Sequence, residues 1–110
     1  MTRRTTTGKA AFEPVVIGDR SLGVALVAAL EAADPVDRAT HGFHTYPAGM
    51  HPDAARGLVA ALPGDSVFDP FCGGGTVLVE AMLAGKRAIG RDVSPVALRV
   101  ARARTSVLAA

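Results

Sequence analysis

Two aspartates and a run of three glycines are the residues of this sequence best suited to chemistry. Asp69 closes one apolar stretch, Gly73, Gly74 and Gly75 follow it, and Asp92 comes at the end of a second apolar stretch. A glycine-rich turn between a strand and a helix lets the backbone approach a ligand closely, because no side chains fill the space. One carboxylate can pair with an ammonium group, and another can accept hydrogen bonds from two ribose hydroxyls. The pattern therefore indicates a ligand that carries both groups.

Two familiar nucleotide motifs do not fit the glycine run. In the dinucleotide pattern G-x-G-x-x-G, Gly73 and Gly75 fill the first two places but Leu78 fills the third. A phosphate-binding P-loop needs a Gly-Lys-Ser/Thr ending, whereas this loop continues as Gly-Gly-Thr-Val. A nicotinamide-dependent oxidoreductase therefore remains only a weak alternative, and S-adenosylmethionine is the ligand that supplies both an ammonium group and a ribose. The simpler alternatives are a tight turn without a ligand and, for Asp92, a charge placed at a helix N-terminus.

Strands and helices alternate around these residues. Strands are expected at 67–69 and 88–93, and helices at 21–33 (capped by Ser21), 53–62, 76–85 (closed by Gly85) and 96–104 (capped by Ser94). The last third of the chain is therefore a βαβα unit, whose two strands should lie parallel with a right-handed crossover. The expected fold class is α/β, with an incomplete sheet preceded by helices.

Length and composition restrict the classes of protein that remain. The 110 residues allow one domain, with 49% hydrophobic residues and a net charge of +2. The single Cys72 cannot form an internal disulfide, and no paired His/Cys spacing predicts a metal site. The apolar run at 22–30 is too short to span a membrane, so a cytoplasmic protein without a membrane partner is expected. We expect a flexible basic tail (1–20), a helical N-terminal segment (21–40) and a partial cofactor-binding domain (41–110).

The motifs also resemble those of a known family. DPFCGGGT at 69–76, then LVEA, then AIGRDVSP at 88–95 resemble the cofactor-binding motifs of S-adenosylmethionine-dependent methyltransferases that modify amino groups of DNA adenine or cytosine. Those motifs usually read DPFxGSGT, so Gly74 replaces a serine, or a threonine in related RNA enzymes, with the loss of one hydroxyl. Upstream, FHTYPAGMHPDAARGLV at 43–59 resembles the segment that packs against the methionine end of the cofactor. The resemblance covers roughly 43–105 and implies a partial Rossmann-like class I methyltransferase fold.

The resemblance implies S-adenosyl-L-methionine as the cofactor and assigns the residues that bind it. By this assignment Asp69 and the backbone of the glycine run hold the methionine portion, and Asp92 binds the ribose. The pocket wall and the remaining motif positions are Tyr46, Pro47, His51, Phe71 and Thr76. The plainer interpretation of Tyr46, His44 and His51 is turn packing and helix capping.

The group that would hold the reacting amine is missing from the sequence. Related enzymes use a tetrapeptide such as DPPY, NPPF or SPPW, but this chain has no Asn, no Trp and no Pro-Pro pair. Residues before position 43 are too few for the strands that normally separate the two motifs, so the missing half is expected beyond Ala110 or on a partner chain. The chain would be a truncated, split or remnant methyltransferase that is inactive by itself. No catalytic residue is assigned.

Nucleic acid is the expected substrate, and DNA (adenine N6 or cytosine N4) is favoured over RNA. The alternatives are a fragment of a tRNA guanine-N2 methyltransferase and a non-catalytic cofactor-binding module that completes a partner chain. Arg99, Arg102 and Arg104 on the last helix could contact phosphate, although such a stripe is more often a solvated face. Cys72 belongs to the glycine motif and is rejected as a nucleophile of the cytosine-C5 type.

Overall fold

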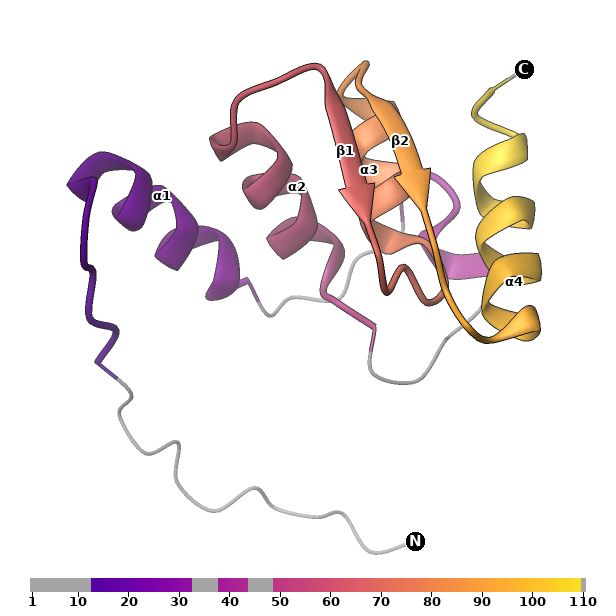
Figure 1. Ribbon diagram of the computed structural model, residues 1–110, viewed down its shortest axis with the longest axis horizontal. Coiled ribbons are helices and arrows are strands. Elements are labelled where there is room, and N and C mark those ends of the chain that lie inside the picture. The colour runs from indigo at the N-terminus through magenta and orange to yellow at the C-terminus, as the bar shows by residue number, and fades with distance from the viewer. Residues whose placement is uncertain (1–12, 33–37, 44–48, 110) are drawn as a thin grey trace, which may run out of the picture.

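The structure is a computed structural model that describes residues 13–32, 38–43 and 49–109. Helices and strands follow one another in the expected order (Figure 1). They are α1 (Arg20–Leu30), a short 3-10 helix η1 (His41–Phe43), α2 (Pro52–Ala61), β1 (Ser66–Asp69), α3 (Thr76–Leu83), β2 (Arg87–Gly90) and α4 (Pro95–Ser106). The chain is thus a mixed α/β structure, which confirms the fold class in its coarse form.

The sheet consists of two parallel strands, as the crossover predicted. β1 pairs with β2 so that Val67 lies opposite Ala88 and Phe68 opposite Ile89. Figure 1 shows α3 behind the two strands, with α2 and α4 on either side of it. Ala88 packs on the buried core, whereas Phe68 and Ile89 stay 59% and 42% exposed. Since side chains alternate across a strand, one face of the sheet is packed on helices and the other is open among the described residues.

Small side chains form the core beneath the sheet. Cys72, Leu78 and Ala101 cluster there, and Leu98 packs against them. A Cβ atom on Gly90 would lie 2.4 Å from Cδ1 of Leu78, which is closer than such atoms can approach. The last residue of β2 must therefore be a glycine for α3 to pack directly on the strand.

The residues that begin or end three of the helices are those expected from the sequence, at the starts of α2 and α4 and at the end of α3. Ser94 accepts a hydrogen bond from the Ala97 N–H (3.3 Å), Pro52 and Pro95 occupy the first turns of α2 and α4, and Gly85 follows α3 with a φ of 75°. The cap of α1 was predicted wrongly. Asp19, not Ser21, accepts the Leu22 N–H (2.7 Å), and the Ser21 hydroxyl donates to the same carboxylate (3.0 Å). A carboxylate one residue before the helix therefore takes the capping role from the serine.

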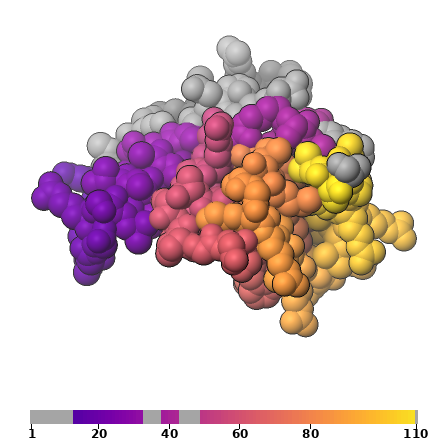
Figure 2. Space-filling model, turned by 90° about the horizontal axis from the view of Figure 1, so that it is seen from above, coloured from indigo at the N-terminus to yellow at the C-terminus, as the bar shows by residue number. Residues whose placement is uncertain are grey.

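α1 continues the layer of helices away from the sheet. It packs on α2 so closely that a Cβ atom on Gly57 would lie 2.5 Å from Cβ of Ala29. Figure 2 shows α1 at one end of the molecule and α4 at the other, with the strands between them. In the parts of the chain that the structure describes, no helix is both long and apolar enough to cross a membrane. The predicted tail at 1–12 lies outside the described residues.

Candidate cofactor site

The turns that follow β1 and β2 are fastened to each other by backbone hydrogen bonds. The Cys72 N–H donates to the Arg91 carbonyl (2.9 Å), and the Arg91 N–H donates to the Asp69 carbonyl (2.9 Å). Within the first turn, the Phe71 N–H donates to Oδ1 of Asp69 (3.1 Å), and the Gly75 N–H donates to the Cys72 carbonyl (2.8 Å). The carboxyl ends of the parallel strands thus form one rigid rim, where open α/β sheets bind ligands.

Gly75 meets two requirements inside the protein itself. Its φ of 87° lies in the left-handed region that disfavours other residues. A Cβ atom there would also lie 3.1 Å from Cα of Ala101, so α4 packs directly on the glycine run. The glycines therefore do more than clear space for a ligand, since at least this one lets a helix approach the loop.

Asp92 lies in the turn two residues beyond β2, slightly later than its predicted place at the end of the strand. Oδ2 accepts the Gly73 N–H (2.9 Å), and Oδ1 accepts the Ser94 N–H (2.8 Å). These hydrogen bonds, from Ser94 first and Gly73 second, lower the pKa of Asp92, so it is a carboxylate at neutral pH. The bond to Ser94 supports the plainer interpretation of Asp92 as a charge at a helix N-terminus. Each oxygen still has a lone pair for a further donor.

Apolar side chains stand exposed beside these carboxylates. Phe71 is 85% exposed and Val93 is fully exposed, although both follow closely on an acidic residue of the rim. Thr76 opens α3, whose N-cap Gly75 provides no side chain to satisfy the first amides of the helix. The sequence analysis included Phe71 and Thr76 but missed Val93. Its sequence signal is its position, because it is an apolar residue directly after Asp92, which the resemblance assigns to the ribose.

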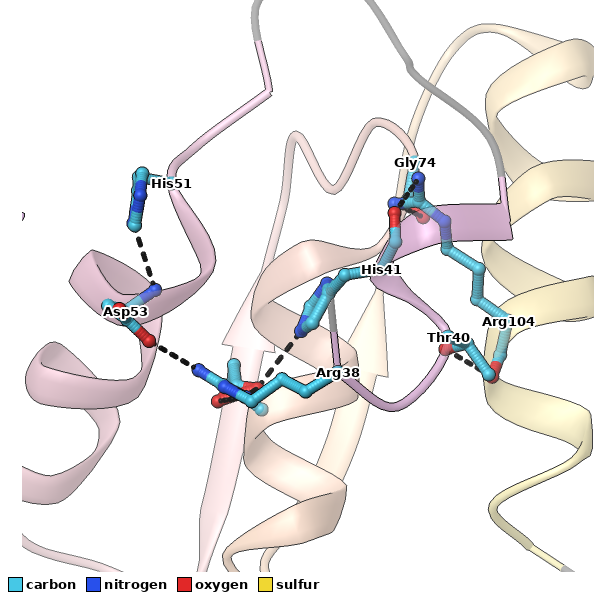
Figure 3. Close-up of polar contacts among 8 residues, drawn as sticks. Arg38, Thr40, His41, His51, Asp53, Gly74 and Arg104 are labelled. Carbon is cyan, nitrogen blue, oxygen red and sulfur yellow. Dashed lines mark hydrogen bonds and ion pairs between the residues drawn. The ribbon is translucent and has the colours of Figure 1, made fainter. Parts of the chain in front are cut away.

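The structure gathers most of the predicted site but leaves part of it apart. Asp69, Phe71, Thr76, Asp92 and the glycine run share the rim. His51 instead caps α2, where its Nδ1 accepts the Asp53 N–H (3.1 Å), and Figure 3 places it beside Asp53 and apart from Gly74. This is the capping role that the plainer interpretation gave it. Tyr46, Pro47 and His44 lie outside the described residues.

A buried polar network behind the rim was not predicted. Nη1 of Arg38 donates to both oxygens of Glu80 (2.6 and 2.5 Å), Nη2 donates to Asp53 (2.8 Å), and Nε2 of His41 lies 3.0 Å from Glu80. Burial raises the pKa of Glu80, but the hydrogen bonds from Arg38 and then His41 outweigh it and leave that pKa lowered. The network ties residues 38–41 to α2 and α3. In the sequence, its only sign is one glutamate inside the apolar run TVLVEAML.

Arg104 is buried, which corrects both interpretations given to it from the sequence, the solvated helix face and the phosphate contact. It is 4% exposed, and its guanidinium donates to the Gly74 carbonyl (3.0 Å) and the His41 carbonyl (3.4 Å) (Figure 3). Burial lowers the pKa of Arg104, but an arginine remains charged in a protein, and the carbonyls replace part of its hydration. Arg99 and Arg102 on the same helix are exposed and remain available to a polyanion.

Cys72 and the candidate metal ligands give the site no further chemistry. Burial raises the pKa of the Cys72 thiol, and the charges of Asp69 and Asp92 raise it further, so the thiol stays neutral. A neutral buried thiol is a poor nucleophile, in agreement with its rejection from the sequence. Among the residues that the structure places, no three His, Cys, Asp or Glu side chains group as metal ligands do.

Fold and site together define a class: a small α/β domain that presents acidic residues and a glycine loop at the carboxyl ends of parallel strands. A comparison with protein families matches residues 41–109 to the RMKL-like methyltransferase domain. More than half of the chain is matched, and the chain belongs to this family.

The relatives that match part of this chain carry two kinds of name, type II methyltransferase and tRNA (guanine(10)-N2)-dimethyltransferase. The type II methyltransferase M.MvaI of Kocuria varians is 33% identical over 72 residues, which cover 61% of this chain and 16% of the relative. The tRNA (guanine(10)-N2)-dimethyltransferase of Methanothermobacter thermautotrophicus is 45% identical over 51 residues, or 44% and 15% of the two chains. The type II methyltransferase M.MjaII of Methanocaldococcus jannaschii is 39% identical over 57 residues, or 50% and 11%. The matched part is about a sixth of these proteins or less, and no solved structure gives a significant match.

Proposed function

We propose that this chain binds S-adenosylmethionine and supplies the cofactor half of a methyltransferase that acts on amino groups of nucleic acid. The observation that carries the proposal is the bond from the Gly73 N–H to Asp92, which joins the glycine loop to the acidic residue after β2. The rim therefore presents two carboxylates, a bare backbone and exposed apolar side chains. This set of donors and acceptors fits the ammonium, ribose and adenine groups of the cofactor, arranged as in a Rossmann-like fold.

Each group of the cofactor has a candidate partner on the rim. Asp92 binds the ribose hydroxyls with the lone pairs that its two backbone bonds leave over. Phe71 and Val93 cover the adenine, because both are apolar and exposed beside the acidic residues. Asp69 pairs with the ammonium group, and the glycine loop with the start of α3 lies along the methionine portion. The bound cofactor would supply an activated methyl group, whereas these residues bind and orient it.

The substrate proposal is an exocyclic amino group of DNA, with tRNA guanine-N2 as the alternative. The longest of the three alignments above, 72 residues, is with a type II methyltransferase, which supports DNA. The higher identity, 45%, is with a tRNA dimethyltransferase, which keeps the alternative open. Because the sequence contains no Pro-Pro tetrapeptide, the group that holds the amine would come from outside these residues.

Calorimetric titration with S-adenosylhomocysteine tests the cofactor proposal directly. The unsubstituted chain is compared with Asp92→Ala and with Asp65→Ala, an exposed aspartate before β1, and NAD serves as the ligand control. We expect saturable binding of S-adenosylhomocysteine that Asp92→Ala weakens by about a hundredfold, since hydrogen bonds to a charged group contribute about 1.5–3 kcal/mol each. Equal binding by both variants, or no binding by a chain with a cooperative unfolding transition, contradicts the proposal.

A second candidate function is favoured by the open face of the sheet. Phe68 and Ile89 lie side by side on it, and β1 and β2 each have an unpaired edge among the described residues. Exposed apolar faces and strand edges favour association with another chain. In this case the chain would be a non-catalytic module that completes a partner methyltransferase. Gel filtration of the chain with a separately produced catalytic segment of a related enzyme tests it, and separate elution at micromolar concentration argues against it.

A further inference from the structure

Arg104 joins two segments that lie far apart in the sequence, the glycine loop and η1. Its side chain extends from α4 between the glycine loop and η1, and contacts one backbone carbonyl from each (Figure 3). Thr40 adds a third link, because its hydroxyl donates to the Arg104 carbonyl (3.0 Å). The residue is 4% exposed and so cannot serve as a surface charge.

The bond to Gly74 fixes a peptide plane of the glycine loop from one side. The carbonyl of Gly74 and the N–H of Gly75 belong to the same planar peptide unit. Arg104 holds the carbonyl at 3.0 Å, and the Cys72 carbonyl holds the N–H at 2.8 Å. Two peptide units earlier, the Gly73 N–H is held by Asp92. Glycines resist rotation poorly by themselves, so these three bonds determine which backbone groups face the ligand.

The chemistry of the side chain suits this task better than any other cation would. A guanidinium is planar and carries five N–H donors in a fixed fork, so it can serve two carbonyls from different segments at once. A lysine ammonium carries its three donors on one nitrogen at the end of a flexible stem, so it cannot reach the two carbonyls from separate nitrogens, as Nη1 and Nη2 of Arg104 do. Moreover, Ala101 lies one turn earlier on α4 and packs against Gly75, so α4 presents both its surface and Arg104 to the glycine run.

We propose that Arg104 is a positioning residue of the cofactor site, which sets the conformation of the glycine loop and holds η1 against it without touching the cofactor. The inference rests on the proposed function for its ligand, but the loop conformation can be measured with no ligand present. The last motif quoted for the family ends at Pro95, so none of these motifs includes Arg104.

The test uses the 110-residue chain with Arg104→Met, which keeps the length without the donors, and Arg104→Lys, which keeps the charge and can reach one carbonyl. Arg102→Met, an exposed residue on the same helix, is the matched control. In a two-dimensional amide NMR spectrum, Arg104→Met should shift the Gly73 and Gly75 signals, whereas Gly57 and Gly64, which lie elsewhere, should not move. Affinity for S-adenosylhomocysteine, corrected for the folded fraction, should fall by about tenfold or more, because a charged hydrogen-bond donor is lost. Arg104→Lys should recover part of both effects.

A purely structural role predicts a different result. It would lower the unfolding midpoint while the folded fraction kept unchanged Gly73 and Gly75 signals and unchanged affinity, and that result overturns the proposal. Shifted signals with unchanged affinity overturn it as well. If the folded, unsubstituted chain binds no S-adenosylhomocysteine, the proposed function fails, while the glycine signals still decide whether Arg104 sets the loop.

One measurement does not depend on the variants folding. In the unsubstituted chain, the Nη protons of Arg104 should give separate, slowly exchanging signals, because bonds to two carbonyls stop rotation of the guanidinium. A single averaged signal, as for exposed Arg102, would contradict the proposal.

Discussion

Glu80 and Asp92 are both acidic residues with a lowered pKa, but they lie in opposite surroundings. The Glu80 side chain is 1% exposed, and its partners are the side chains of Arg38 and His41. The carboxylate of Asp92 is half-buried at the rim, and its partners are two backbone amides. One region binds the protein to itself, and the other retains acceptor capacity toward solvent.

Exposure and the kind of hydrogen-bond partner distinguish these two carboxylates. The carboxylate of Glu80 is covered and accepts three hydrogen bonds from the side chains of Arg38 and His41, so almost none of it faces solvent. Asp92 keeps free lone pairs and has the exposed Val93 as its neighbour. The following substitutions test this contrast, beginning with the largest expected effect.

Glu80→Gln should destabilise the chain most. It removes the anion that Arg38 and His41 share and leaves Arg38 with Asp53 alone, and breaking a buried ion pair by removing one partner costs about 3 kcal/mol or more. Urea unfolding at pH 7 measures the change in the free energy of unfolding. The control is Glu31→Gln, an exposed glutamate just after α1, which should leave stability nearly unchanged. Equal effects of the two substitutions would show that the network does not hold residues 38–41 in place.

Gly75→Ala should have the next largest effect. The substitution adds a Cβ atom at a φ of 87° and 3.1 Å from the backbone of Ala101, so both strain and overpacking oppose it. We expect a loss of about 2–3 kcal/mol. Gly85→Ala is the matched control, because Gly85 has a φ of 75° but no atom within 4 Å of its Cβ position. It should lose only the strain, about 1 kcal/mol, and a similar loss at both positions would show that α4 does not press on the loop.

Lowering the pH should remove the contribution of Glu80 selectively. Because its pKa in the folded chain is below the ordinary value of 4.5, its stabilisation is fully present above that value. It is lost as the pH falls from about 4.5 through the lowered pKa. The difference in unfolding free energy between the unsubstituted chain and Glu80→Gln should therefore narrow over this range. A difference that stays constant from pH 7 to pH 3 would mean that the carboxylate charge is not what stabilises the network.

The residues of the rim could be predicted from the sequence, whereas the network around Glu80 could not. Asp69, the glycine run and Asp92 were predicted to meet because the carboxyl ends of parallel strands share an edge, and the structure brings them together. The parallel pairing, the crossover helix and the caps at Ser94 and Gly85 also follow from local patterns. These are features whose partners lie within a few residues or whose geometry follows from the βαβ connection.

The Glu80 network and the contacts of Arg104 depend on residues that are distant in the sequence. Arg38 and Glu80 are 42 positions apart, and Arg104 and Gly74 are 30 apart, so no local period relates them. The arginine stripe of the last helix misled the prediction for the same reason. Arg102 and Arg104 are both arginines of the same predicted helix. Only the position of α4 against the glycine loop decides which of the two is buried. Likewise, the cap of α1 depended on a choice between Asp19 and Ser21 that spacing left open.

Val93→Ser should have the smallest effect on stability and still weaken cofactor binding. The side chain is fully exposed, so the free energy of unfolding should change by no more than about 0.5 kcal/mol. If Val93 covers the adenine, losing its apolar surface should weaken S-adenosylhomocysteine binding by several-fold, to about tenfold, since burying such a side chain contributes about 1.5 kcal/mol. Val107→Ser, an exposed valine at the end of α4, should change neither quantity. A substitution at the rim would then lower the affinity for S-adenosylhomocysteine and leave the free energy of unfolding nearly unchanged, whereas Glu80→Gln mainly lowers the free energy of unfolding. If Val93→Ser binds S-adenosylhomocysteine with unchanged affinity, Val93 does not cover the adenine.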